Sequence, residues 1–216
     1  MTKKPDSLSN EFYFDEETAT NAVAFFEECL THTTGEWAGR PFILEQWQAD
    51  IVSNIFGWKR VSDDTRRYRT AFIALPRKNG KTTFAAGLAL YASLCDGELG
   101  GQAINAAADR EQARLCFDVA KGMINNEPIL EERCKVYKNS IVIPNTGSSY
   151  KVVSSEAYSK HGLNLSYFGA DELHAWPDPE LWDVMTTSMG ARRQPLTVVT
   201  TTAGYNRQSI CYELWD

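Results

Sequence analysis

Hydrophobic positions along the chain follow two different periods, and the change between them lies near residue 68. Over residues 15–31 and 45–56, apolar side chains recur every three or four residues, which predicts two amphipathic helices. Residues 1–14 are polar with scattered aromatic residues, and they predict a loose arm. From residue 68 onward, short apolar runs replace this helical period and predict strands.

The second part of the chain alternates between strands and helices. Strands are predicted at 68–75, 102–107, 166–170 and 196–201, with a β-hairpin formed by 140–144 and 149–154. Helices are predicted at 81–94, 109–123 and 179–189, with a short one after Tyr205. Such alternation indicates a mostly parallel sheet covered on both faces. The predicted fold class is therefore α/β, in one domain: an N-terminal helical segment (1–60) and a core (61–216).

The composition narrows the class of protein. Hydrophobic residues make up 43% and charged residues 23% of the 216 residues, as in ordinary globular domains. No apolar run approaches the ~18 residues of a membrane span, and no apolar segment follows Lys3-Lys4, so we expect neither a membrane partner nor a secretory signal. Five scattered cysteines without metal-ligand spacing indicate reduced, buried thiols in a cytoplasm.

The net charge of −6 bears on nucleic-acid binding. It argues against a domain that coats nucleic acid by itself, since affinity for phosphate comes mostly from Lys and Arg. A local basic patch, or a brief contact with DNA inside an assembly, stays open. The densest basic stretch, residues 59–69, flanks Asp63-Asp64, so we interpret it as a solvated loop.

Residues 75–83 contain the second half of a phosphate-binding loop, with Leu75 in place of the first glycine. Backbone N–H groups near Gly80 and the start of the next helix would face phosphate oxygens. Lys81 would reach the β- and γ-phosphates of ATP, Thr82 would bind Mg²⁺, and Arg77 would stabilise γ-phosphate charge in the transition state. A basic turn before an ordinary helix is the alternative. The expected ATP-binding residues here are Arg77, Lys78, Asn79, Gly80, Lys81, Thr82 and Thr83.

An acidic pair, Asp171-Glu172, follows the strand predicted at 166–170. Asp171 would hold Mg²⁺, and Glu172 would be the general base that polarises the attacking water. Acidic residues that complement a helix dipole are the alternative, which the upstream lysine loop disfavours. Thr200, Thr201 and Thr202 end the last predicted strand, either as ordinary β-branched residues or as a sensor of the γ-phosphate. His174 is interpreted as a structural or coupling residue.

These motifs, in this order, resemble those of the large subunit of tailed-phage terminases, the DNA-packaging motor ATPases, and in particular the HK97-type branch. The resemblance is carried by residues 36–42, 45–48, 56–58, 76–82, 161–164, 171–176 and 200–204. It implies a P-loop ATPase of the additional-strand (ASCE, RecA-like) class, in which a phosphate loop without its first glycine but with an arginine is normal. It also implies that Gln46 recognises adenine and that residues 200–204 couple hydrolysis to motion of DNA.

The resemblance further implies partners. Family members move viral double-stranded DNA into a procapsid as a pentameric ring on the portal protein, and a small terminase subunit recognises the DNA. Such a protein would work in the host cytoplasm. Full-length members also carry a C-terminal nuclease domain, for which we expect no room in 216 residues.

Two other functions stay open. Residues 171–174 also fit the D-E-x-H pattern of many helicases, although such enzymes need a second motor domain. The chain would alternatively be a non-catalytic nucleotide-binding assembly module. In a ring, a neighbouring subunit would supply a cation in trans, for which the sequence offers Arg110, Arg114 and Lys160.

Overall fold

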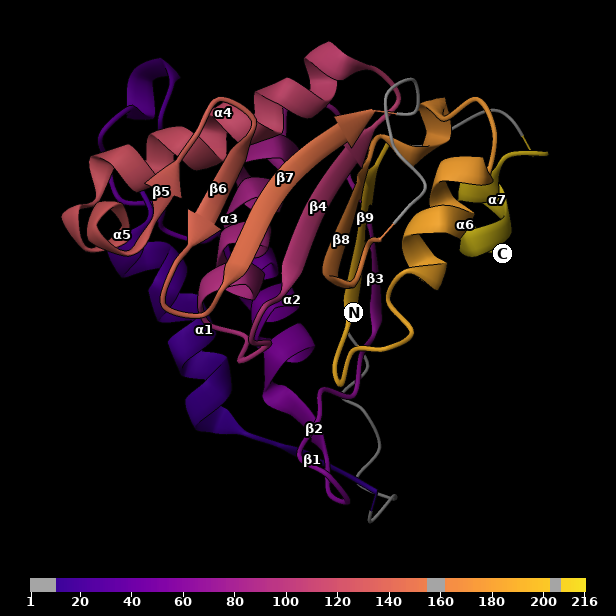
Figure 1. Ribbon diagram of the computed structural model, residues 1–216, viewed down its shortest axis with the longest axis horizontal. Coiled ribbons are helices and arrows are strands. Elements are labelled where there is room, and N and C mark those ends of the chain that lie inside the picture. The colour runs from indigo at the N-terminus through magenta and orange to yellow at the C-terminus, as the bar shows by residue number, and fades with distance from the viewer. Residues whose placement is uncertain (1–10, 155–161, 203–206) are drawn as a thin grey trace.

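The computed structural model describes residues 11–154, 162–202 and 207–216, and a seven-stranded sheet forms its centre (Figure 1). The strand order is β3-β9-β8-β4-β7-β6-β5. Five neighbouring strands run parallel: β3 (Thr70–Ala74), β9 (Leu196–Thr201), β8 (Leu165–Asp171), β4 (Gln102–Ala107) and β7 (Ser148–Ser154). The hairpin strand β6 (Ser140–Ile143) and the short β5 (Lys135–Val136) extend one edge in antiparallel fashion. The predicted mostly parallel sheet is confirmed.

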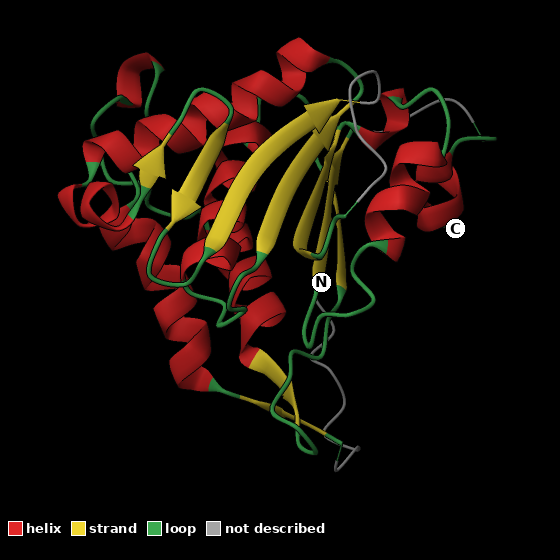
Figure 2. Cartoon of the chain, viewed as in Figure 1, coloured by secondary structure: helices red, strands yellow, loops and turns green. Residues whose placement is uncertain are grey.

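Helices cover both faces of the sheet (Figure 2), and each face has its own hydrophobic core. One core is formed with α1 (Glu16–Cys29), α2 (Gln46–Gly57), α3 (Lys81–Leu94), α4 (Arg110–Asn126) and α5 (Pro128–Arg133). The other is formed with η2 (Leu173–Ala175), α6 (Glu180–Thr187) and α7 (Ile210–Trp215). Neighbouring residues of β8 point to opposite faces, with Tyr167 in the first core and Phe168 in the second. The central strands are therefore buried on both faces.

Helix α3 lies deep in the first core, and small residues make this possible. Ten consecutive residues, 84–93, are buried, which leaves no solvent-facing stripe. A Cβ atom added at Gly87 would lie 2.4 Å from Cε1 of Phe26 in α1, so only glycine allows this approach. The first residue of α3 is Lys81. Tight packing of α3 therefore fixes the backbone position of Lys81, the lysine of the predicted phosphate loop.

The N-terminal prediction is wrong for residues 12–14. They form strand β1 (Phe12–Phe14), which pairs antiparallel with β2 (Trp58–Arg60). Phe14 packs edge-on against Trp58 at 5.4 Å between ring centroids, and the guanidinium of Arg67 lies over the Phe12 ring at 4.5 Å. These contacts join residues far apart in the sequence, so a local pattern does not reveal them. A 3₁₀ turn, η1 (Gly35–Trp37), lies between α1 and α2.

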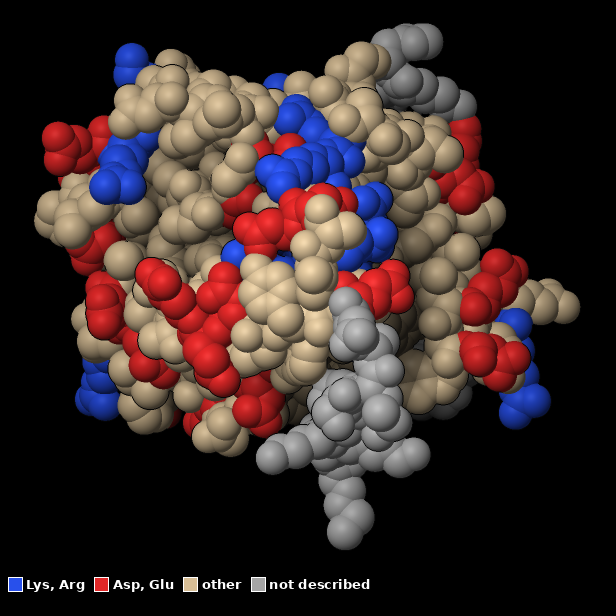
Figure 3. Space-filling view, turned by 90° about the horizontal axis from the view of Figure 1, so that it is seen from below, with Lys and Arg blue, Asp and Glu red and all other residues tan. Residues whose placement is uncertain are grey.

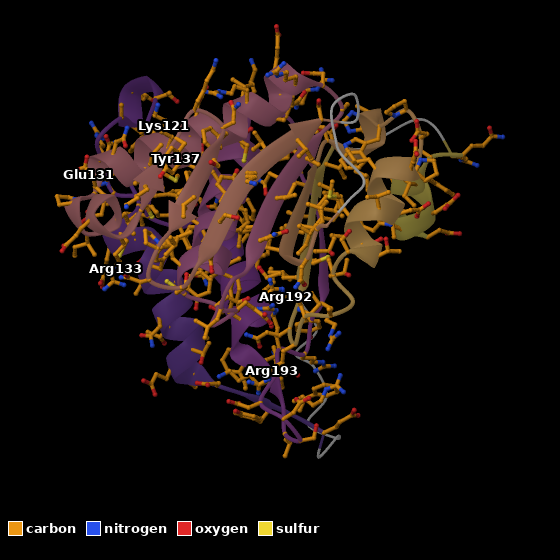
Figure 4. All side chains as sticks on the ribbon, in the orientation of Figure 1. Lys121, Glu131, Arg133, Tyr137, Arg192 and Arg193 are labelled. Atoms are coloured by element: carbon orange, nitrogen blue, oxygen red, sulfur yellow. The ribbon has the colours of Figure 1, made fainter. Side chains whose placement is uncertain are left out.

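The basic stretch 59–69 is not simply a solvated loop, because Arg66 is buried. Its guanidinium forms an ion pair with Asp96 at 2.5 Å and also donates to the carbonyl of Gln194. Nearby, Arg192 pairs with Glu98 at 3.5 Å. Arg192 and Arg193 lie in the lower half of the molecule (Figure 4), and the view from below shows Lys and Arg side chains beside acidic ones (Figure 3). Charge pairing across loops holds this end of the sheet together.

All five cysteines are free thiols, as predicted. Cys116, Cys134 and Cys211 are buried as predicted, Cys29 is only half-buried, and the prediction of burial is wrong for Cys95, which is exposed. None of the described helices is both long and apolar enough to cross a membrane.

Candidate functional site

Three sequence motifs meet at the carboxyl ends of the parallel strands. Residues 75–80 connect β3 to α3, Asp171 ends β8, and Thr201 ends β9. Since β3, β9 and β8 are adjacent in the sheet, these ends lie side by side at the upper edge in Figure 1. In open parallel sheets this is the edge where ligands bind. A pocket of about 520 Å³ lies here, lined by Arg77, Lys78, Gly80, Lys81, Thr82, Thr83, Gln112, Glu172, His174 and Ala175.

The loop before α3 has a tightly turned backbone. Lys78 and Gly80 have φ values of 67° and 69°, in the left-handed region that favours glycine. The Asn79 side chain donates to the carbonyl of Pro76 at 3.2 Å, which closes the turn on itself. Arg77 and Lys78 are exposed, and neither makes an ion pair with any described residue. The turn therefore presents to the pocket the first N–H groups of α3 and two cations that have no ion-pair partner among the described residues.

Lys81 and Glu172 are direct partners in this structure. The Lys81 ammonium lies 3.0 Å from Oε1 of Glu172, and the two side chains are 7% and 17% exposed. The same ammonium donates to the carbonyl of Leu75 at 3.3 Å. Glu172 has a φ of 46°, which is uncommon for a residue with a side chain and costs about 1 kcal/mol or more. Such strain, retained beside a cation in a pocket, is typical of a functional site.

Asp171 lies behind Glu172 and is 6% exposed. Its Oδ1 accepts hydrogen bonds from the Thr200 hydroxyl at 2.9 Å and from the Glu172 backbone N–H at 3.0 Å. Burial raises the pKa of its carboxyl group, and the Thr200 hydrogen bond opposes this shift. A cation would favour the ionised form of such a carboxylate.

The end of β9 makes contacts throughout the segment 171–174. Thr200 contacts Asp171, as above, and the Thr201 hydroxyl accepts from the His174 backbone N–H at 3.3 Å. The Thr202 backbone N–H donates to Oε2 of Glu172 at 3.2 Å. The structure thus brings all three predicted threonines onto the acidic motif rather than directly into the pocket lining.

A divalent cation fits the donor atoms of this site in kind. Asp171 supplies a carboxylate and Thr82 a hydroxyl, which are hard oxygen ligands of the type that Mg²⁺ prefers. The described residues contain no cluster of three or more His, Cys, Asp or Glu side chains that could form a complete cage. A small number of protein oxygens, completed by phosphate and water, is the usual arrangement for Mg²⁺.

Some predicted residues lie away from the pocket. Gln46, the first residue of α2, is exposed, and its amide donates to Asp50 at 2.9 Å rather than lining the pocket. Arg110 and Arg114 line a separate pocket with Lys138. Lys160 lies outside the described residues, as do residues 161 and 203–204 of the family motifs.

Gln112 lines the main pocket and was not predicted. It lies in the first turn of α4, where its backbone N–H is capped by Asp109 at 2.8 Å. The signal was present in the sequence: the predicted cap at Asp109 follows a strand of the same parallel sheet. The first turn of that helix therefore had to open at the same edge as the phosphate loop.

Comparison with known proteins identifies the family. The family described as "Terminase large subunit, ATPase domain" matches residues 46–216. The chain belongs to this family. The terminase large subunit of Enterobacteria phage HK97 is 31% identical over 191 residues, which cover 85% of this chain and 36% of that protein. The terminase large subunit of Lactococcus phage p2 is 20% identical over 221 residues, covering 96% and 40%. This terminase chain thus spans well under half the length of these relatives.

Solved structures agree with the family assignment. The crystal structure of the HK97 bacteriophage large terminase matches with a TM-score of 0.78 and 26% identity, over 91% of this chain and 40% of that one. The ATPase domain of the large terminase from Thermus phage P74-26 matches with a TM-score of 0.54 at 15% identity, over 68% and 64%, and this shows a shared fold. The predicted fold class, a RecA-like terminase ATPase domain, is confirmed.

Proposed function

We propose that this terminase ATPase domain hydrolyses Mg²⁺-ATP in the pocket between α3 and β8, and that hydrolysis moves viral double-stranded DNA into a procapsid. The contact between Lys81 and Glu172 is the observation that carries the site. It places the predicted phosphate-binding cation and the predicted general base within one hydrogen bond of each other, at the edge of the sheet where ligands bind. The family membership of the chain supports the same activity.

The roles of the pocket residues follow from their positions. Backbone N–H groups and the Lys81 ammonium would hold the phosphates. The N–H groups belong to the turn that precedes α3 and to the first turn of α3, which together comprise Lys78, Asn79, Gly80, Lys81, Thr82 and Thr83. Arg77, exposed and unpaired among the described residues, would approach the γ-phosphate and stabilise its charge in the transition state. Asp171 and Thr82 would hold Mg²⁺, which neutralises phosphate charge when bound.

Nucleotide binding would redistribute the partners of Glu172. A triphosphate competes for Lys81, since a phosphate carries more charge than one carboxylate oxygen. When Lys81 turns to phosphate, Oε1 of Glu172 is left facing the pocket without its cation. A carboxylate in that position can accept a proton from the attacking water, which is the function of a general base.

Residues outside the pocket lining would also take part. Gln46 would recognise adenine, for which its amide would have to leave Asp50 and form hydrogen bonds with the adenine ring. Thr200, Thr201 and Thr202 would transmit the state of the pocket along β9. Residues 1–60 would contribute the adenine side of the site and residues 61–216 the ATPase core. The partners would be a pentameric ring of copies, the portal protein and a small terminase subunit, in the host cytoplasm.

Phosphate release at varied protein concentration, with and without linear double-stranded DNA, tests this function. Turnover per chain that rises steeply with concentration supports a ring in which neighbours complete the site. Absence of turnover at every concentration, with DNA and a partner subunit present, would instead favour a non-catalytic assembly module. Unwinding of duplex by the chain alone would favour a helicase.

A further inference from the structure

The two carboxylate oxygens of Glu172 have different surroundings. Oε1 faces Lys81 at 3.0 Å, on the side of the pocket. Oε2 faces the end of β9, where the Thr202 backbone N–H lies at 3.2 Å and its hydroxyl at 3.4 Å. The third neighbour of Oε2 is Nδ1 of His174, at 3.2 Å. A ligand in the pocket can thus compete for the partner of Oε1, while the partners of Oε2 all belong to the protein.

His174 is itself held on a rigid frame. It lies in η2 between Leu173, which is fully buried in the second core, and Ala175. The Trp176 indole N–H donates to the carbonyl of Asp171 at 3.0 Å and closes the turn that carries His174. The His174 side chain is 21% exposed and borders the pocket. These contacts fix the backbone that carries the imidazole beside Glu172.

The same ring nitrogen of His174, Nδ1, also lies close to the end of β9. It lies 3.1 Å from the Thr201 hydroxyl and 3.3 Å from the Thr202 hydroxyl. The backbone N–H of His174 donates to the Thr201 hydroxyl at 3.3 Å. Among the described residues, the imidazole is the side chain that touches both the carboxylate of Glu172 and two threonines of the β9 end.

We propose that His174 is the positioning residue of Glu172. A hydrogen bond from its Nδ1–H fixes Oε2, so that Oε1 stays aimed into the pocket once a triphosphate has taken Lys81. This inference rests on the proposed function, in which Glu172 is the general base. His174 would orient the base. Through its contacts with Thr201 and Thr202, it would also connect the end of β9 to the base.

Orientation matters because Glu172 loses a partner at the moment when it must act. Without Lys81, the strained residue keeps only its Oε2 contacts, and of these His174 contributes the side chain that shares the pocket wall. Loss of this contact would let the carboxylate rotate away from the water. A displacement of about 1 Å in a catalytic group can cost about 100-fold in rate.

Three substitutions at His174 test the proposal in the presence of Mg²⁺-ATP and DNA. His174→Asn retains an N–H donor close to the position of Nδ1, whereas His174→Leu keeps the size of the side chain and removes the donor. We expect His174→Ala and His174→Leu to lower kcat about ten- to 100-fold, with KM and the Kd for ATP changed less than about twofold. His174→Asn should recover most of the rate. Unchanged kcat in His174→Leu, or equal losses in Asn and Leu, would overturn the proposal.

The same assay distinguishes the positioning role of His174 from the role of Glu172 as general base. If Glu172→Gln hydrolyses ATP as fast as the unsubstituted chain, the general base is wrongly assigned. If Glu172→Gln is inactive but His174→Leu is fully active, only the positioning role fails. A crystal structure with Mg²⁺ and a non-hydrolysable ATP analogue tests the role without turnover. We expect Lys81 on phosphate and Oε2 still on His174; a Glu172 carboxylate turned away from His174 would contradict the proposal.

Discussion

The ammonium group of Lys81 lies 3.0 Å from Oε1 of Glu172, so the cation of the phosphate loop is bound to the carboxylate that follows β8. Both side chains are largely buried, and each compensates the charge of the other. A ligand that enters the pocket must therefore offer Lys81 a better anion. This requirement favours phosphate over weakly charged ligands and links occupation of the pocket to the release of Glu172.

Replacement of Lys81 should abolish tight nucleotide binding. In Lys81→Ala, the pocket loses its buried cation while Glu172 remains as an uncompensated negative charge facing the phosphates. We expect the affinity for Mg²⁺-ATP to fall at least about tenfold, since hydrogen bonds to charged groups contribute about 1.5–3 kcal/mol. Titration calorimetry measures this loss. Lys135→Ala, an exposed lysine on the edge strand β5, is the matched control and should bind ATP normally. Equal affinity in both variants would remove Lys81 from the site.

Replacement of Asp171 should separate stability from metal binding. Burial raises the pKa of Asp171, so between the unfolded and the folded pKa the folded chain holds a proton that the unfolded chain has lost. Without metal, the contribution of Asp171 to stability is therefore greatest below the ordinary Asp pKa and is lost as pH rises through the raised value. Asp171→Asn keeps an oxygen for the Thr200 and Glu172 hydrogen bonds but carries no charge. We expect the variant to be at least as stable as the original chain at pH 7, with any gain vanishing in acid.

Urea unfolding at several pH values, with and without Mg²⁺ and ADP, checks the Asp171 prediction. Mg²⁺ should add to the stabilisation by ADP in the original chain but not in Asp171→Asn. Asp118→Asn, in which the replaced carboxylate is 53% exposed, should behave like the original chain in both respects. A variant that is clearly less stable at pH 7 without metal, or that keeps the Mg²⁺ effect, would contradict this account of Asp171.

The buried pair of Arg66 and Asp96 should be important for stability at the opposite end of the sheet. Their side chains are 3% and 7% exposed, and burial raises the pKa of Asp96 while Arg66 lowers it. Arg66→Ala would leave a buried carboxylate without a cation, at a cost of about 3–5 kcal/mol in the free energy of unfolding. Chemical denaturation measures this cost. Arg193→Ala, an exposed arginine of the neighbouring loop, should change stability by less than about 0.5 kcal/mol. Similar losses in both variants would show that the pair is not what stabilises this end.

Periodic elements were predictable from the sequence because local rules determine them. The alanine-rich run 81–94 and the apolar runs 102–107 and 196–201 have the predicted bounds, since burial on two sides leaves a continuous hydrophobic signal. Strand β1 and the burial of Arg66 were not predictable, because each depends on partners far along the chain. A strand of three residues is too short to show a hydrophobic period. The sequence around an arginine also does not indicate which distant aspartate will form an ion pair with it.

The candidate site shows the same division. The glycine–lysine turn and the acidic pair were recognisable as motifs, and the strand order brings them together. The ion pair between Lys81 and Glu172 and the network around His174 depend on side-chain geometry at the ends of three strands. No spacing in the sequence encodes which oxygen of Glu172 faces which partner. The hydrogen-bond partners of the threonines depend on the position of β9 next to β8, which the sequence does not specify.

Glu172→Gln tests the central claim most directly, because glutamine keeps the size of the side chain but cannot take up a proton. Binding of Mg²⁺-ATP and release of phosphate should be measured on the same preparation, with DNA present and at a protein concentration where the original chain turns over. We predict that Glu172→Gln binds ATP at least as tightly as the original chain, since Lys81 is freed for phosphate, and that phosphate release falls by a factor of about 100 or more. Undiminished phosphate release by Glu172→Gln would contradict the assignment of this pocket as a hydrolysis site in which Glu172 is the base.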